Sequence, residues 1–545
     1  MDVTYRARPY VCGAVGRFDE AHIDRLKAGA PAPLRELHRS TTAVLLASAD
    51  VQAWQAGDDR GFSWNALAEG VSPSSWQAAA ERWGAAGLAF SATSSTLHTD
   101  AVGIQDLFTR RIGDAVYFSV RIDLLARLDD SALHTDWTAW ASILALAAPM
   151  SDATPFEEIR RMTAATAWQA DDRGVSQTSF EPGWLAAEPD GSVKPHDAVA
   201  AVDACVPGGD RLAITLSGGW DSRLLAILAR RRSDEVVAWT TSDDDGRDRD
   251  LRLAPPVAEA LGIEHHNVVP GDDAWLEELS PVRRRFDFQS LLHVWLMPLA
   301  RVLHGRPERL LDGLAGDVLF KSLFVPEEVA AAVDPDERHR LLWDNLGQNR
   351  LNDPARLAPG VSADFEARSR ASVVDSVARF DGHPAAATLG VLHTRTARAI
   401  ALSPLRLLAP ESDVRVPFVH PVVIDAALRV APTDKLDGRF YRDMLVSADP
   451  KIARLPSTND GGPKEKRGPR RQTSPAALGD MAAMIRADGM VAGLLGPEIR
   501  QSLDDADTLH RVGTSVRGHR VLNWASLLAE WRATYASVLA DDTPA

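Results

Sequence analysis

The spacing of apolar positions changes near residue 195, and the change divides the chain into two parts. Beyond that point, short apolar runs alternate with longer helical patterns: strands are predicted at 211–216, 235–241 and 264–269, and helices at 221–232 and 255–261. Strands that alternate with helices at this spacing build parallel sheets with right-handed crossovers. We therefore predict an α/β domain over 195–545 that is mostly helical in its later part.

The part before residue 195 has shorter alternating runs. Two strands are predicted at 105–110 and 114–120, joined by a turn near 112–113, and the apolar stretch 139–150 is predicted to be a buried helix because it is too short to cross a bilayer. A polar, turn-rich stretch then leads to Pro195. It is typical of a connection between domains, so we place the first domain at 1–185.

Composition and charge exclude several classes of protein. The 545 residues are 45% hydrophobic and 25% charged, which is typical of a globular protein. The net charge of -15 disfavours a nucleic-acid partner. Only Cys12 and Cys205 occur, which excludes a disulfide scaffold and a Cys-rich metal site. With no export or membrane segment recognised, we expect a cytoplasmic protein without a membrane partner.

The segment most informative about chemistry is Leu216–Ser222, with the sequence LSGGWDS. It joins a predicted strand to a predicted helix, at the sheet edge where open α/β proteins bind ligands. Paired glycines bring backbone N–H groups close to an anion, and Ser217 and Ser222 add hydroxyl donors. No lysine follows the glycines, so this is not the common GxxxxGK[ST] loop. Asp221 in a phosphate site requires a cation, which indicates Mg²⁺; the alternative is a glycine-rich turn without a ligand.

This segment resembles the SGGxDS motif of the PP-loop ATP pyrophosphatases, and a second segment narrows the family. Leu311–Phe320 (LDGLAGDVLF) is similar to the GxGGDExF segment of the asparagine synthetase family. The resemblance implies a doubly wound PP-loop synthetase domain that uses ATP with Mg²⁺, in which Asp317 joins Asp221 as the second metal ligand. It also implies that the nucleotide is cradled by seven residues: Leu216, Ser217, Gly218, Gly219, Asp221, Ser222 and Gly313.

Further segments follow the same family in the same order. Thr154–Arg161 looks like the family's entry to the synthetase domain, Asp413–Phe418 (DVRVPF) is similar to its ExRxPFLD segment, and Lys435 stands at a recurring lysine position. The agreement in order makes asparagine synthetase-like enzymes the family that this chain resembles over most of its length.

The start of the chain resembles a glutaminase that has lost its chemistry. Cys12–Asp19 (CGAVGRFD) resembles the CGIxGxFD start of the family's N-terminal glutaminase domain, whose cysteine is the nucleophile. Eleven residues precede Cys12, so its amine is in a peptide bond unless the chain is processed, and such a nucleophile needs that amine as its base. The glutamine-binding segment NGEIYN has no counterpart. We interpret 1–185 as a degenerate glutaminase-like (N-terminal nucleophile) α/β domain with Cys12 buried.

Departures from the family pattern select a subclass. Leu314 stands where asparagine synthetases have Glu and β-lactam synthetases have Tyr, and Leu cannot act as a base. The family's late catalytic lysine is missing from Arg454–Asp460; Lys464 and Lys466, in the basic run 464–471, are the candidates to act with Asp317 in catalysis. That run is either a solvated loop or a lid over the substrates. The acidic run 243–245 is expected to be a solvated turn.

These observations lead to one hypothesis and its alternatives. We expect an ATP-dependent amide-forming ligase, most like a lasso-peptide cyclase, that adenylates a side-chain carboxylate of a precursor peptide and joins it to the N-terminal amine as a macrolactam. The resemblance implies a leader-recognition protein and a leader peptidase as further partners. The alternatives are a β-lactam synthetase-like or asparagine synthetase-like enzyme on a small amino-acid substrate, and a non-catalytic scaffold that retains the fold.

Overall fold

The computed structural model describes residues 8–68, 72–306, 309–347, 356–410, 412–460 and 467–544. Within them the chain forms two compact units. The antiparallel unit contains residues 8–139, 149–185 and 535–544, and the parallel unit contains residues 140–148 and 186–534. The domain boundaries placed at 185 and 195 from sequence stay a prediction.

The antiparallel unit consists of two sheets, each of six strands. The strands of the first sheet have the order β10 (Ile159–Arg161), β8 (Phe108–Ile112), β9 (Ala115–Ser119), β1 (Val11–Gly16), β3 (Ala43–Ala47) and β2 (Arg35–Arg39). The strands of the second sheet have the order β12 (Gly174–Ser179), β11 (Thr166–Asp171), β7 (Ser95–His98), β6 (Ala86–Phe90), β5 (Asp59–Trp64) and β4 (Gln52–Ala56). One apolar cluster contains Val11 and Phe118 from the first sheet and Trp64, Leu88 and Leu97 from the second. The sheets therefore pack face to face around a shared core. Three helices accompany them: α1 (Glu20–Gly29), α2 (Trp76–Arg82) and α3 (Ile122–Ala126).

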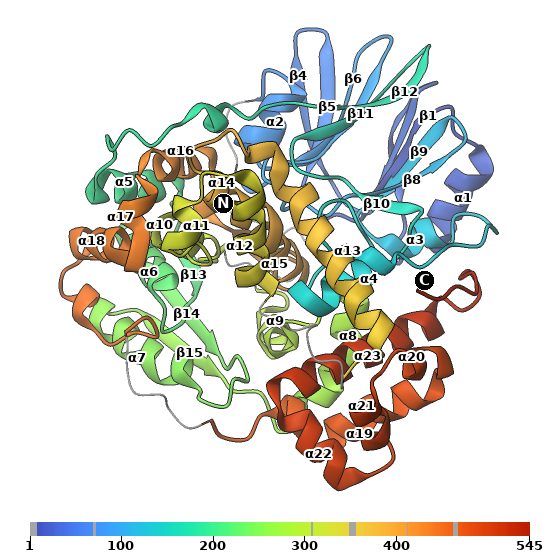
Figure 1. Cartoon of the computed structure of the whole chain (residues 1–545). Helices are drawn as coiled ribbons and strands as arrows, with labels where there is room; N and C mark the ends of the chain where they lie inside the picture. The colour runs from blue at the N-terminus through green and yellow to red at the C-terminus, as the bar shows by residue number, and fades with distance from the viewer. Residues whose placement is uncertain are drawn as a thin grey trace. The chain divides into compact units, whose positions relative to one another are not determined.

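The parallel unit is built on a five-stranded sheet, seen in part in Figure 1 as neighbouring strands β13, β14 and β15. Its order is β15 (Glu264–Val268), β14 (Glu235–Thr241), β13 (Arg211–Thr215), β16 (Arg309–Leu311), β17 (Asp413–Arg415), and every pairing is parallel. The three strands predicted from sequence agree to within one residue. The last two strands are only three residues long, and the sequence analysis missed them.

Helices follow the strands as expected and then dominate the chain. Helix α6 (Trp220–Arg232) follows β13 and α7 (Arg249–Leu261) follows β14, while the predicted buried helix at 139–150 is α4 (Trp137–Leu146). The α/β fold class with a largely helical later part is confirmed. The remaining α-helices are α5 (Pro195–Cys205), α8 (Ala274–Arg285), α9 (Met297–Leu303), α10 (Gly316–Lys321), α11 (Glu327–Ala331), α12 (Pro335–Gly347), α13 (Pro359–Val377), α14 (Ala386–Val391), α15 (Ala397–Leu402), α16 (Pro421–Arg429), α17 (Pro432–Lys435), α18 (Arg439–Ala448), α19 (Pro475–Ala487), α20 (Gly489–Gly493), α21 (Pro497–Ser502), α22 (Ala506–Thr514) and α23 (Val516–Thr534).

The strand order brings two loops together. From β13 the chain proceeds outward through β14 to β15, and it then returns to the other side of β13 as β16 and β17. The loops after β13 and β16 therefore leave neighbouring strands at the same sheet edge, at the point where the strand order reverses. Both sequence motifs lie in these loops.

Among the helices of the described ranges, none combines the length and the apolar character needed to cross a membrane.

Lys435 is a structural residue at the end of α17. Its side chain is 0% exposed, and its ammonium Nζ donates a hydrogen bond of 2.6 Å to the carbonyl of Ala427. Burial lowers the pKa of Lys435 to about 7, because removal from water penalises the charged form. The folded state thus binds this proton less tightly than the unfolded chain does.

We predict that Lys435→Met stabilises the protein at pH 7 by about 2–4 kcal/mol. Because the pKa is lower in the folded state, the unfolded state holds the extra proton between about pH 7 and 10, and wild-type stability rises with pH across that window. Urea unfolding between pH 7 and 10 measures this slope, which the variant should flatten. Lys451→Met, at an exposed lysine, is the control and should change neither stability nor slope. A Lys435→Met protein that unfolds at lower urea concentration at pH 7 would contradict the assignment.

Candidate active site

The loop after β13 is held in shape by its own serines. The backbone N–H of Ser217 donates to Ser222 Oγ at 3.0 Å, and the N–H of Gly219 donates to Ser217 Oγ at 3.1 Å. A Cβ at Gly218 would lie 2.9 Å from side-chain carbons of Leu253 and Thr458, so this position requires glycine. The sequence-predicted cradle is therefore a tight turn that leads into α6 at Trp220.

The Gly218 amide already binds an anion from the protein itself. Its N–H donates to Asp250 Oδ1 at 2.8 Å, from the first turn of α7. Burial raises the pKa of Asp250, whereas the bond from Gly218 favours its charged form. The Gly218 N–H thus points to a position that an anion can occupy. A phosphate oxygen could accept a hydrogen bond from this N–H only after it had displaced the Asp250 carboxylate.

Residues 452–460 are fastened to the same loop. The fully buried Arg223 donates to the carbonyls of Leu455 and Pro456, both at 2.7 Å. The indole of Trp220 donates to Ser457 Oγ at 3.1 Å, and the N–H of Thr458 donates to the Gly218 carbonyl at 2.9 Å. Residues 454–460, where the family's catalytic lysine is absent, therefore pack against the loop after β13 and the start of α6, and they make these contacts through backbone and hydroxyl groups.

The loop after β16 brings Asp317 to Asp221. The N–H of Asp317 donates to Asp221 Oδ2 at 3.2 Å, across 96 residues of sequence. A Cβ on Gly313 would lie 3.0 Å from the Ser222 nitrogen, and one on Gly316 would lie 2.9 Å from Asp221 Oδ1. Both glycines are thus required for the two loops to touch, and the structure brings together the two carboxylates singled out from sequence.

The environment of the pair is unfavourable to two negative charges. Burial raises the pKa of both carboxyls, and the charge of Asp317 raises the pKa of Asp221 further. The positive charges of Lys321 and Arg395 act in the opposite direction on Asp317. Tyr441 is buried beside Asp221, and its own pKa is raised by burial and by that carboxyl.

One oxygen of the pair is left without a partner. Among the described residues, the buried Asp221 Oδ1 makes no hydrogen bond of standard geometry, and neither does the hydroxyl of Tyr441. An unsatisfied carboxylate oxygen next to a second carboxylate suits a hard cation, and Mg²⁺ takes one or two carboxylates with phosphate oxygens and waters. No cluster of three or more His, Cys, Asp or Glu able to hold a metal occurs in the described part of the chain. The donor set therefore fits a magnesium ion completed by a nucleotide.

The basic run is only partly described. Lys464 and Lys466 lie outside the described residues. Beyond them, Gly468 N–H donates to the Gly246 carbonyl at 2.7 Å, and Arg471 N–H donates to Asp244 Oδ1 at 2.8 Å. The expectation of a solvated acidic turn holds for the exposed Asp243 and is wrong for Asp244. Asp244 is 3% exposed, and its carboxylate accepts hydrogen bonds from the backbone N–H groups of Arg471 and Gln472.

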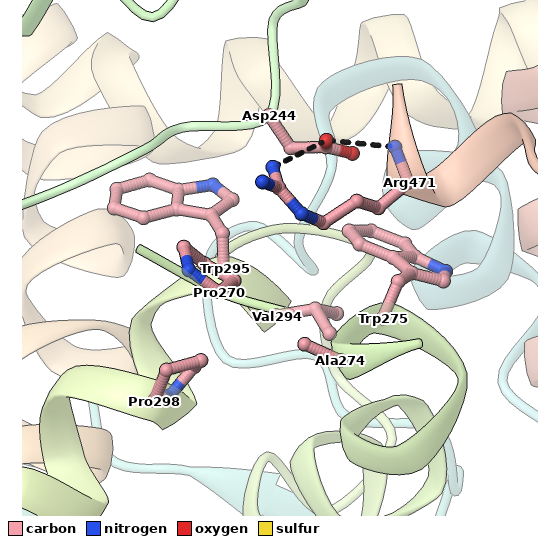
Figure 2. Close-up of a pocket in the computed structure, with 8 residues that line it drawn as sticks. All are labelled: Asp244, Pro270, Ala274, Trp275, Val294, Trp295, Pro298 and Arg471. Carbon is pink, nitrogen blue, oxygen red and sulfur yellow. Dashed lines mark hydrogen bonds and ion pairs between the residues drawn. The ribbon is translucent and has the colours of Figure 1, made fainter. Parts of the chain in front are cut away.

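A small hollow lies beyond the ends of β14 and β15 in the parallel unit. Figure 2 shows its two indoles, Trp275 and Trp295, on opposite sides of Val294, with the Asp244–Arg471 pair near them. Pro270, Ala274 and Pro298 complete the lining. The Arg471 guanidinium is 3.5 Å from Asp244 and donates to the Gly271 carbonyl. The surface that lines this small hollow is therefore mostly apolar.

Sequence reasoning missed two cations near the carboxylate pair. Lys321 follows Asp317 by four residues in α10, a spacing that places both on one face and could have been noticed. Arg395 lies on a π-helical turn, Leu392–Thr396, and stacks 4.4 Å from the ring centroid of Phe324. No local pattern marks Arg395, because only the tertiary fold brings it to Asp317.

Cys12 is buried, as the sequence predicted. It lies inside β1, paired with Leu46 of β3 and Ser119 of β9, and is 0% exposed. Burial raises the pKa of its thiol to about 12. The thiolate needed for nucleophilic attack is therefore disfavoured at neutral pH.

Comparison with known proteins gives one informative match. Residues 198–457 match the family model described as asparagine synthase. No curated protein matches the chain significantly. Solved structures similar to this chain include the allosteric regulatory enzyme of purine biosynthesis (8% identity, 48% of this chain, 75% of that chain, TM-score 0.19). Another is the glutamine phosphoribosylpyrophosphate amidotransferase from B. subtilis with ADP and GMP (10%, 56%, 74%, TM-score 0.20).

We predict that Asp221→Asn and Asp317→Asn each weaken binding of Mg-ATP and lower AMP formation by about 10³-fold or more, because each removes a charge that holds the metal. Both variants should stay folded, since each relieves repulsion between buried like charges. Calorimetry of Mg-ATP binding and thermal unfolding measure the two effects. Asp425→Asn, at a surface ion pair with Arg429, is the control. Near wild-type Mg-ATP affinity in either site variant would refute the metal assignment.

Proposed function

We propose that this protein closes a macrolactam ring in a precursor peptide. Residues 198–457 match the asparagine synthase family model, whose members are ATP-dependent, AMP-forming carbon–nitrogen ligases. In this lasso-peptide cyclase reaction the carboxylate and the attacking amine belong to one substrate chain. The paired Asp221 and Asp317 beside the LSGGWDS loop supply the site for Mg-ATP.

The buried Cys12 is the observation that carries this proposal. An asparagine synthetase requires ammonia from a glutaminase, whose cysteine must be exposed and ionisable. Here the thiol lies inside a central strand, and its pKa is raised to about 12. Ammonia is then not delivered by the chain, which favours a substrate that brings its own amine.

The reaction divides into two steps. The side-chain carboxylate of the peptide attacks the α-phosphorus of ATP, and the bond to pyrophosphate breaks, which leaves a mixed anhydride with AMP. The peptide's amine then attacks the activated carbonyl, loses a proton, and expels AMP. Magnesium, when bound, neutralises charge on the departing pyrophosphate. Asp221 and Asp317 hold that ion, and the serine-braced loop orients the phosphates.

The nature of the hollow supports a peptide over a small amino-acid derivative. A small zwitterionic substrate needs charged partners for its α-amino and α-carboxylate groups, whereas Trp275, Val294 and Trp295 offer apolar surface. Arg471, the cation at this site, is engaged by Asp244. These features suit an apolar or aromatic side chain of a peptide, whose leader would be handled by a recognition protein and a peptidase.

We predict that purified protein with Mg-ATP converts a leaderless precursor peptide encoded beside its gene to a product lighter by one water, with one AMP per ring. Mass spectrometry and AMP assay on the same sample measure both. AMP formation with a small amino-acid derivative alone would identify a β-lactam synthetase-like or asparagine synthetase-like enzyme instead. Absence of AMP with every substrate, together with absence of ATP binding, would identify a scaffold.

We predict that Trp295→Ala raises KM for the peptide about tenfold, because it removes one wall of the hollow, and leaves KM for ATP unchanged. Steady-state AMP release against each substrate measures the two constants. If the KM for the peptide is unchanged, the hollow is not part of the substrate-binding site. A parallel rise in the KM for ATP would place it at the nucleotide.

A further inference from the structure

Lys321 is fixed beside the phosphate loop by aromatic packing. Its ammonium Nζ lies 5.3 Å from the ring centroid of Trp220, the residue that follows the paired glycines. The indole is itself anchored by its bond to Ser457. On the same side, a Cβ at Gly438 would lie 2.8 Å from the Trp220 ring and 3.2 Å from Lys321 Cγ, so the stem of the lysine is closely packed. A lysine confined in this way is oriented by the fold.

The charge of the same ammonium acts on the carboxylate pair, although Lys321 is not hydrogen-bonded to it. Its positive charge acts on both Asp221 and Asp317. Yet within the described ranges Lys321 makes no hydrogen bond, and no carboxylate oxygen lies within 4.0 Å of its Nζ. Its three N–H donors therefore remain available to a ligand that enters the site.

The site needs such a cation. The segment Leu216–Ser222 contains no Lys or Arg, so it contributes hydroxyl and amide donors only. One magnesium ion between two carboxylates adds no net positive charge, whereas the triphosphate brings several negative charges that concentrate on the leaving pyrophosphate. Lysine binds phosphate as a point charge, and a fixed cation at the leaving group stabilises the transition state.

We propose that Lys321 is the phosphate-binding lysine of this enzyme: it contacts the β- and γ-phosphates of Mg-ATP and stabilises the pyrophosphate as it leaves. Lys321, on α10, would thus provide the positive charge for which the sequence had indicated Lys464 and Lys466 in the basic run 464–471. This inference rests on the proposed function for the identity of pyrophosphate as the leaving group. Arg395, whose charge acts on Asp317, lies on a different element and stacks on Phe324.

Binding of inorganic pyrophosphate with Mg²⁺ tests this without any peptide. Lys321→Met and Lys321→Gln should each weaken pyrophosphate binding about tenfold or more in calorimetry, and Lys321→Arg should restore most of it. The matched control is Arg442→Met, because Arg442 lies 5.6 Å from the same Trp220 ring and no effect of its charge on either carboxylate is resolved. Its pyrophosphate affinity should stay within about twofold of wild type.

A second readout separates catalysis from packing. In AMP release with peptide, Lys321→Met should lower kcat about 10²-fold, whereas Lys321→Arg should recover at least a tenth of the wild-type rate. Pyrophosphate binding by Lys321→Met and Lys321→Gln within twofold of wild type would overturn the proposal. If the wild-type enzyme forms no ring from any peptide, the proposed function fails, and pyrophosphate binding still decides the role of Lys321.

Discussion

The close approach of two half-buried carboxylates, Asp221 and Asp317, is the constraint on which the rest of the active site depends. Two negative charges in a partly desolvated place repel each other and lose hydration, so the arrangement is unfavourable until a cation binds. The fold accepts it because neighbouring strands β13 and β16 deliver both loops to one edge. Gly313 and Gly316 remove the side chains that would keep the loops apart.

The phosphate loop is braced before any nucleotide arrives. Ser217 and Ser222 bond to its amides, the Asp250 carboxylate binds the Gly218 amide, and Arg223 fastens residues 452–460 beside it. Binding a phosphate at Gly218 would exchange one anion for another, so the amide would keep a partner throughout. Such a loop is preorganised, and nucleotide binding requires little new ordering of the backbone.

The antiparallel unit holds Cys12 in an environment that disfavours nucleophilic attack. Its two sheets pack around a shared core, and Cys12 is fully buried in β1 as a small apolar side chain. Function is a property of sites and not of folds, and the carboxylate pair with its two loops lies in the parallel unit.

Local patterns by themselves determined the α/β class, three strands to within one residue and the LSGGWDS loop, because periodicity and paired glycines are features of neighbouring residues. The resemblance to the asparagine synthetase family indicated that Asp317 pairs with Asp221. The short strands β16 and β17 were not predicted from the sequence, because three residues are too few to show an alternating pattern. Asp250 on the Gly218 amide, the burial of Asp244 and the cations Lys321 and Arg395 were decided by tertiary structure alone. Each depends on contacts between segments far apart in sequence, where charge and burial are set by packing.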